Sequence, residues 1–130
     1  MLALLPPKIR RGAVLIDPSY ELKTEFTDVA RLLGRASQRW PQGTYIVWYP
    51  ILARERHLNL VEKLARLPQE RKYHSELRWR VSASTRGLLG SGLIVLNAPW
   101  RFEVGFDASL ATLASILSNG TTAEHESELL

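Results

Sequence analysis

Residues 12–21 of the chain read Gly-Ala-Val-Leu-Ile-Asp-Pro-Ser-Tyr-Glu. The uninterrupted apolar run over 13–16 is typical of a strand that is buried on both faces of a sheet. Asp17 and Pro18 follow this run directly, and Tyr20 comes two residues later. Ligands bind outside the carboxyl ends of strands in open α/β sheets, so we expect Asp17 to face a ligand. A simple turn after a strand is the common alternative for an Asp-Pro-x-Tyr sequence.

The rest of the chain predicts alternating helices and strands. Apolar residues recur every three or four positions over 22–40, which predicts an amphipathic helix that ends before Pro41. Three further strands are predicted over 44–49 (stopped by Pro50), 73–82 and 93–96, the last after a glycine-rich link over 87–92. Two further helices are predicted over 54–67 and 107–118, with Asp107 as the N-cap of the second.

This order of elements predicts a mixed α/β sheet with helices on both faces. The first two strands are joined through a helix and should therefore be parallel. The last two strands are joined by a short link, so one of them should run antiparallel to the rest.

The composition excludes several classes of protein. A length of 130 residues suits one domain or part of one. No apolar run approaches the roughly 18 residues of a membrane span. The absence of cysteine excludes a disulfide framework and a thiolate metal site, and His57, His74 and His125 lack metal-ligand spacing. No metal site is predicted, and the cytoplasm is the default compartment.

The charge is unevenly distributed along the chain. Residues 119–130 hold three glutamates and no lysine or arginine, and we expect this acidic tail to be disordered. Without the tail, 17 basic residues stand against 10 acidic ones, so the body carries +7 where the whole chain carries +4. Such a body suits a polyanionic partner such as nucleic acid, although a merely basic protein would have the same charge.

The residues after the first strand can hold an amine for methylation. The lone pair of an exocyclic adenine amine is delocalised into the ring, so an enzyme must orient it with hydrogen-bond acceptors. The Asp17 carboxylate and the carbonyl of Pro18 supply two acceptors, and the ring of Tyr20 can stack on an extruded base. The carboxylate can also accept the released proton.

Two other aromatic residues are candidates for binding the substrate. Trp100 ends a similar sequence, Asn-Ala-Pro-Trp over 97–100, and could stack on a base; a strand-ending turn with Trp100 as a packing residue is the favoured interpretation. Tyr49 lies at the end of the second strand, so its ring could line the same cleft as Asp17. Packing of this ring in the core is again the favoured interpretation.

Three segments resemble one known family: RRGAVLIDPSYE over 10–21, GTYIVWYPI over 43–51 and GSGLIVLNAPW over 90–100. In order and spacing they are similar to the carboxyl-terminal half of the RlmJ family, which methylates N6 of an adenine in 23S ribosomal RNA with S-adenosylmethionine. The resemblance covers roughly residues 2–118. It implies the second half of a Rossmann-like class I methyltransferase sheet, with Asp17 beside both the amine and the methyl donor and with Pro18 and Tyr20 next to it. The family pattern has proline where Ser19 and Ala98 stand here, and we expect both changes to loosen the backbone.

The resemblance also implies that the cofactor-binding half of the family lies upstream of this chain. Residues 1–118 would then be a partial methyltransferase domain, with ribosomal RNA as its partner and most of the S-adenosylmethionine pocket outside it. The alternative is an inactive remnant or a small basic RNA-binding module that cannot bind the donor alone. In either case the strand before Asp17 is expected to be an open apolar edge, which favours self-association.

Overall fold

The computed structural model describes residues 1–8, 11–79, 87–117 and 123–130. In chain order the elements along these residues are the 3-10 helix η1 (Leu2–Leu4), β1 (Ala13–Ile16), α1 (Glu25–Arg39), β2 (Thr44–Leu52), α2 (His57–Ala65), β3 (Lys72–Arg78), β4 (Leu88–Leu96), α3 (Phe102–Leu117) and β5 (Glu124–Leu129). None of the helices in these ranges is long and apolar enough to cross a membrane.

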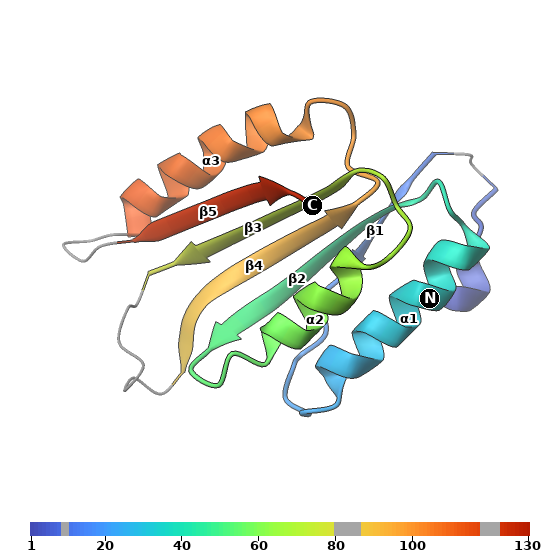
Figure 1. The fold of residues 1–130 in the computed structure, drawn as a ribbon, viewed down its shortest axis with the longest axis horizontal. Helices are drawn as coiled ribbons and strands as arrows, with labels where there is room; N and C mark the ends of the chain where they lie inside the picture. Colours follow the sequence, from blue (N-terminus) through green and yellow to red (C-terminus); the bar gives the residue numbers. More distant parts are fainter. Residues whose placement is uncertain (9–10, 80–86, 118–122) are drawn as a thin grey trace.

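The strands form one mixed sheet in the order β1-β2-β4-β3-β5 (Figure 1). β1 and β2 are parallel, as expected for two strands joined through a helix. β4 is antiparallel to both of its neighbours, β2 and β3, which confirms the prediction of one reversed strand among the four that were expected. β5 is a further strand, antiparallel to β3 at the far edge.

Helices cover both faces of the sheet, as predicted. Tyr45 and Val47 of β2 pack in one core with Leu33 of α1 and Leu60 of α2. Ile46, between them in sequence, packs on the opposite face in a cluster that includes residues of α3. Figure 1 shows α1 and α2 side by side near β1 and β2, and α3 beside β5. The first face holds the larger core.

β1 is the open edge that was predicted, but its burial was predicted incorrectly. It has only β2 as a neighbour among the described strands. Ile16 is buried, while Ala13 and Leu15 are exposed, Leu15 to 66%. Apolar side chains of a parallel strand are buried on both faces only where both faces are covered, and the outer face of β1 is not covered here.

The glycine-rich link belongs to β4, so the prediction of a loop over 87–92 was wrong from Leu88 onward. A Cβ atom on Gly92 would lie 2.0 Å from the ring of Tyr49, and one on Gly90 would lie 2.4 Å from the carbonyl oxygen of Leu77. These glycines therefore allow neighbouring strands to approach closely.

Other predicted boundaries also shifted. β2 continues through Pro50 to Leu52; β1 ends opposite Val47, so Pro50 has a strand neighbour on one side only. β3 ends at Arg78, and residues 80–82 of the predicted strand lie outside the described residues. α3 begins at Phe102, so Asp107 lies within the helix and is not its N-cap. Its carboxylate accepts a hydrogen bond from the Tyr73 hydroxyl at 2.6 Å.

The prediction of a disordered tail was wrong for residues 124–129, which form β5. The tail pairs along the whole of β3 between Tyr73 and Arg78. Glu128 also lies 3.1 Å from Nδ1 of His74. An acidic composition predicts disorder only where no sheet edge is available, and the edge of β3 supplies backbone partners for this segment.

Candidate functional site

Asp17 lies immediately after β1, at the carboxyl end of the edge strand. Its side chain is exposed, and Pro18 is half-buried. Among the described residues, no side chain or backbone amide donates a hydrogen bond to the Asp17 carboxylate. The acceptor that the sequence predicted is therefore accessible from solvent and from the open side of β1.

Tyr20 is buried beneath this turn, which differs from the predicted stacking surface. The residue is only 6% exposed, and its ring centroid lies 4.5 Å from that of Phe26. Its hydroxyl donates a hydrogen bond of 2.8 Å to the carbonyl of Trp48 in β2. Burial, helped by the carboxylates of Asp17 and Glu25, raises the pKa of Tyr20, so the hydroxyl stays protonated as a donor. In this structure Tyr20 anchors the turn and presents no free ring face to a base.

Glu25, the first residue of α1, ties the same turn to this helix. Its carboxylate accepts a hydrogen bond from the backbone amide of Leu22 at 3.1 Å, and the Ser19 hydroxyl lies 3.4 Å from both of its oxygens. A carboxylate at a helix N-terminus is also favoured by the helix dipole. Ser19, where the family pattern has proline, thus makes a polar contact that a proline could not make.

Tyr49 lies in the core, so the prediction that it lines a cleft beside Asp17 is corrected and the core interpretation is confirmed. Its side chain is fully buried. Its hydroxyl lies 2.7 Å from Nε2 of His74 and 2.9 Å from Oε1 of Glu76. A tyrosine buried with its hydroxyl paired in this way cannot reach a ligand at the surface.

The structure separates Trp100 from Asp17. Because β4 runs against β1, the turn after β4 lies at the opposite end of β1 from Asp17: Tyr45 pairs with Leu96, and Thr44 donates a hydrogen bond to the carbonyl of Asn97 at 3.1 Å. The four residues of β1 span about 13 Å between these ends. Trp100 is 81% exposed, so the favoured packing interpretation is also wrong.

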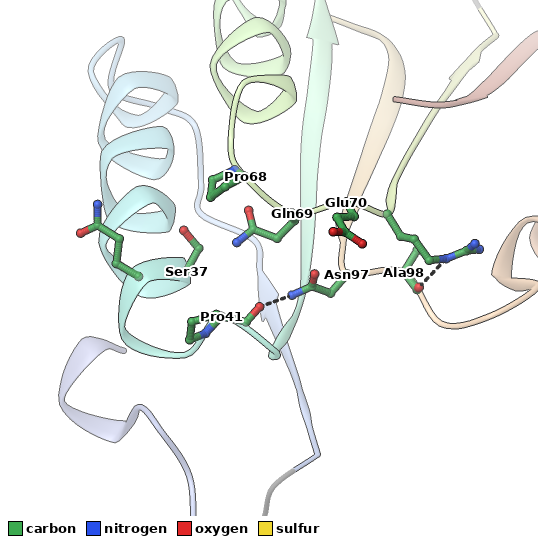
Figure 2. Close-up of a pocket in the computed structure, with 9 residues that line it drawn as sticks. Ser37, Pro41, Pro68, Gln69, Glu70, Asn97 and Ala98 are labelled. Carbon is green, nitrogen blue, oxygen red and sulfur yellow. Dashed lines mark hydrogen bonds between the residues drawn. The ribbon is translucent and has the colours of Figure 1, made fainter.

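A hollow of about 490 Å³ lies at this same end of the sheet, between the end of α1, the segment after α2 and the turn after β4 (Figure 2). Pro41, Pro68, Gln69 and Arg71 contribute to its lining. Figure 2 shows Asn97 directed toward Pro41, and its amide nitrogen donates a hydrogen bond of 2.5 Å to that carbonyl. The Asn97 amide thus closes a turn, and the hollow is separate from the surroundings of Asp17.

A comparison with known families shows to which family the chain belongs. A family model described as "Ribosomal RNA large subunit methyltransferase D, RlmJ" matches residues 1–128. The chain belongs to the RlmJ family. This confirms the resemblance carried by the three segments around Asp17, Tyr49 and Trp100.

Two curated relatives in the RlmJ family bear the name "Ribosomal RNA large subunit methyltransferase J". The Haemophilus influenzae protein is 36% identical over 115 residues and the Escherichia coli protein 35%. Each match covers 88% of this chain and 41% of the relative, so the chain spans about two fifths of their length. The crystal structure of a Legionella pneumophila protein superposes with a TM-score of 0.89 at 29% identity, over 98% of this chain and 46% of that one.

This RlmJ-family chain also contains a buried polar cluster that the sequence analysis missed. Glu76 is 8% exposed and accepts hydrogen bonds from the Tyr49 hydroxyl at 2.9 Å and from Arg78 at 2.6 Å. The ring of His57, fully buried, stacks on Tyr49 with its Nε2 3.4 Å from Glu76. His74, Glu76 and Arg78 alternate along β3 and share one face, where the side chains of Tyr49 and His57 pack against Glu76.

Electrostatics fix the charges in this cluster. Burial alone would raise the pKa of Glu76, but its contacts with His74, Tyr49 and Arg78 outweigh burial and lower the pKa to about 2. Burial lowers the pKa of His57, which is therefore neutral at pH 7. The cluster thus holds an ionised carboxylate against a buried imidazole. Within the described ranges, no group of three or more side chains has the arrangement of a metal site.

Proposed function

We propose that this chain supplies the part of an S-adenosylmethionine-dependent RNA methyltransferase that holds the target amine, N6 of an adenine in 23S ribosomal RNA. The observation that carries the proposal is the exposed carboxylate of Asp17 at the carboxyl end of β1, followed by Pro18. Membership of the RlmJ family supports the reaction class. Such a substrate is consistent with a cytoplasmic protein.

Two acceptors on this turn would orient the amine. The Asp17 carboxylate accepts one N–H and the Pro18 carbonyl accepts the other, which turns the nitrogen lone pair out of the plane of the base. S-adenosylmethionine, when bound, supplies an electrophilic methyl group on a sulfonium. Transfer of that methyl group to the amine would leave the nitrogen with a surplus proton, and Asp17 or water would accept it.

The residues present fit only part of a pocket for the donor. Asp17 can accept a hydrogen bond from the amino group of the donor, and the open side of β1 leaves room beside it. Ala13 and Leu15 are exposed on the outer face of β1, so further walls of the pocket would have to come from other segments of polypeptide. We therefore expect the chain alone to bind S-adenosylmethionine weakly.

A fusion protein tests the proposal. The chain is joined to the portion of the Escherichia coli relative that it does not span, and transfer of labelled methyl groups to unmodified 23S RNA is measured. We expect Asp17→Ala to reduce transfer by roughly 100-fold or more. The control is Asp28→Ala, which removes an exposed carboxylate on α1 that pairs with Arg31. Equal transfer by the Asp17→Ala fusion and the unsubstituted fusion would refute the assignment.

A second function, binding RNA without methylating it, is favoured by the +7 charge of the body. The fusion assay separates the two functions, because a chain that only binds RNA would not restore methyl transfer. Calorimetric titration of the isolated chain with S-adenosylmethionine tests the narrower point of donor binding. Micromolar binding would rule out the view that the chain cannot hold the donor alone.

A further inference from the structure

The turn between β4 and α3 exposes the ring of Trp100. Tryptophan is among the more deeply buried residue types, yet Trp100 is 81% exposed. The guanidinium carbon of Arg71 lies 5.3 Å from the ring centroid, within the range of a cation–π contact. An aromatic ring displayed beside a cation is a surface on which an unpaired base can stack.

Arg71 is held in place by two contacts of its own. Its Nε donates a hydrogen bond of 3.3 Å to the carbonyl of Ala98, and one of its terminal nitrogens lies 3.3 Å from the Glu103 carboxylate. The guanidinium is therefore fixed by α3 and by the turn after β4 before any ligand arrives. A stacking platform that is ordered in advance loses less entropy on binding.

Arg71 and Trp100 each line one of two hollows at this end of the sheet. Arg71 lines the hollow of about 490 Å³ shown in Figure 2. Trp100 lines a second hollow of about 810 Å³ beside the start of β1, together with Arg11, Thr44 and Phe102. No aspartate or glutamate is among the described residues that line the second hollow, so its charge complements a polyanion.

We propose that this end of the sheet binds an unpaired segment of RNA, with one base stacked on Trp100 and the adjoining phosphates near Arg11. The contact is separate from Asp17, at the opposite end of β1 and about 13 Å away. It rests on the proposed function only for the choice of RNA as the polymer. A paired duplex hides the faces of its bases, so the ring of Trp100 selects a single strand.

Binding of an oligonucleotide tests this proposal without any methyl donor. The probe is a fluorescein-labelled oligouridine RNA of about ten nucleotides, and anisotropy is measured with the whole chain. We expect Trp100→Leu to weaken binding about tenfold, because stacking on an aromatic ring contributes roughly 1–3 kcal/mol per base. Trp100→Phe, which keeps a ring, should stay within about threefold of the unsubstituted chain. Arg11→Gln should lower the slope of log K against log salt by about one.

The controls separate RNA binding from general effects. Ile116→Ala removes an apolar side chain on α3 that is 64% exposed and should leave the affinity unchanged. Because Trp100 is exposed, Trp100→Leu should keep the circular dichroism of the unsubstituted chain. Equal affinity for a hairpin duplex and for the single strand, or unchanged affinity after Trp100→Leu, would overturn the inference. A DNA oligonucleotide of the same length shows whether the ribose matters.

The outcome is distinguishable from that of the methylation test. If the fusion does not transfer methyl groups but oligonucleotide binding still depends on Trp100, the proposed function is refuted and the RNA site at Trp100 stands. If the fusion transfers methyl groups but binding does not depend on Trp100, the RNA site is refuted and the proposed function stands.

Discussion

Replacing Glu76 with glutamine tests the buried polar cluster. The lowering of the Glu76 pKa from 4.5 to about 2 means that the folded chain favours the ionised carboxylate by about 3 kcal/mol. Glu76→Gln keeps the size of the side chain and removes its charge. Arg78, 2.6 Å away, loses its anionic partner, and the Tyr49 hydroxyl keeps only a neutral acceptor. We expect the free energy of unfolding at pH 7 to fall by about 3 kcal/mol.

The loss of stability caused by Glu76→Gln should depend on pH. A depressed pKa in the folded state contributes stability that is fully present above pH 4.5 and is lost as the pH falls toward 2. The difference between the unsubstituted chain and Glu76→Gln should therefore be largest above pH 4.5 and should shrink as the pH falls. Urea unfolding followed by tryptophan fluorescence measures both proteins over this range. A difference that stays constant from pH 7 to pH 2.5 would show that the carboxylate is not stabilised by charge.

Three further substitutions test separate parts of the structure. Burial alone would lower the pKa of His74, but Glu76 and Glu128 raise this pKa above 6.5. The stability that the protonated His74 contributes is therefore fully present below pH 6.5 and is lost as the pH rises through the folded-state pKa. Glu128→Gln should weaken this dependence between pH 6 and 8 in urea titrations, and an unchanged dependence would exclude the contact with β5. Tyr20→Phe removes the hydrogen bond to the Trp48 carbonyl and should cost about 1 kcal/mol in the same assay; no loss would mean that the hydroxyl does not anchor the turn. Leu15→Lys places a charge on the open edge strand, so we expect it to reduce self-association in sizing chromatography; a monodisperse monomer before substitution would refute the edge argument.

The sequence predicted the elements whose signals are local. The helical spacing over 22–40 predicted α1, observed as Glu25–Arg39, because one apolar face of that helix packs on one side of the sheet. The short link between the last two strands predicted that one of them is reversed, and the structure shows that this strand is β4. The family and the position of Asp17 after β1 were also predicted from sequence.

The features that sequence analysis missed depend on contacts between distant segments. Gly92 belongs to a strand because the ring of Tyr49, more than forty positions earlier, occupies the space that a side chain would fill. The acidic tail forms β5 because β3 offers it an open edge, and its own composition contains no sign of this. Tyr20 is buried because β2 extends beyond β1 and offers the Trp48 carbonyl to its hydroxyl.

Strand direction determines how the two similar motifs of this chain can be used. Asp17–Tyr20 and Asn97–Trp100 each follow an apolar strand, and their sequences alone make each a candidate for binding a base. β1 and β4 are antiparallel, so the two turns lie at opposite ends of the sheet. An RNA strand that contacts both must extend along the edge past the four residues of β1, and its target base and its stacked base cannot be immediate neighbours. Under the two proposals made above, the length of β1 would therefore set the spacing between a methylated adenine and an unpaired base held by Trp100.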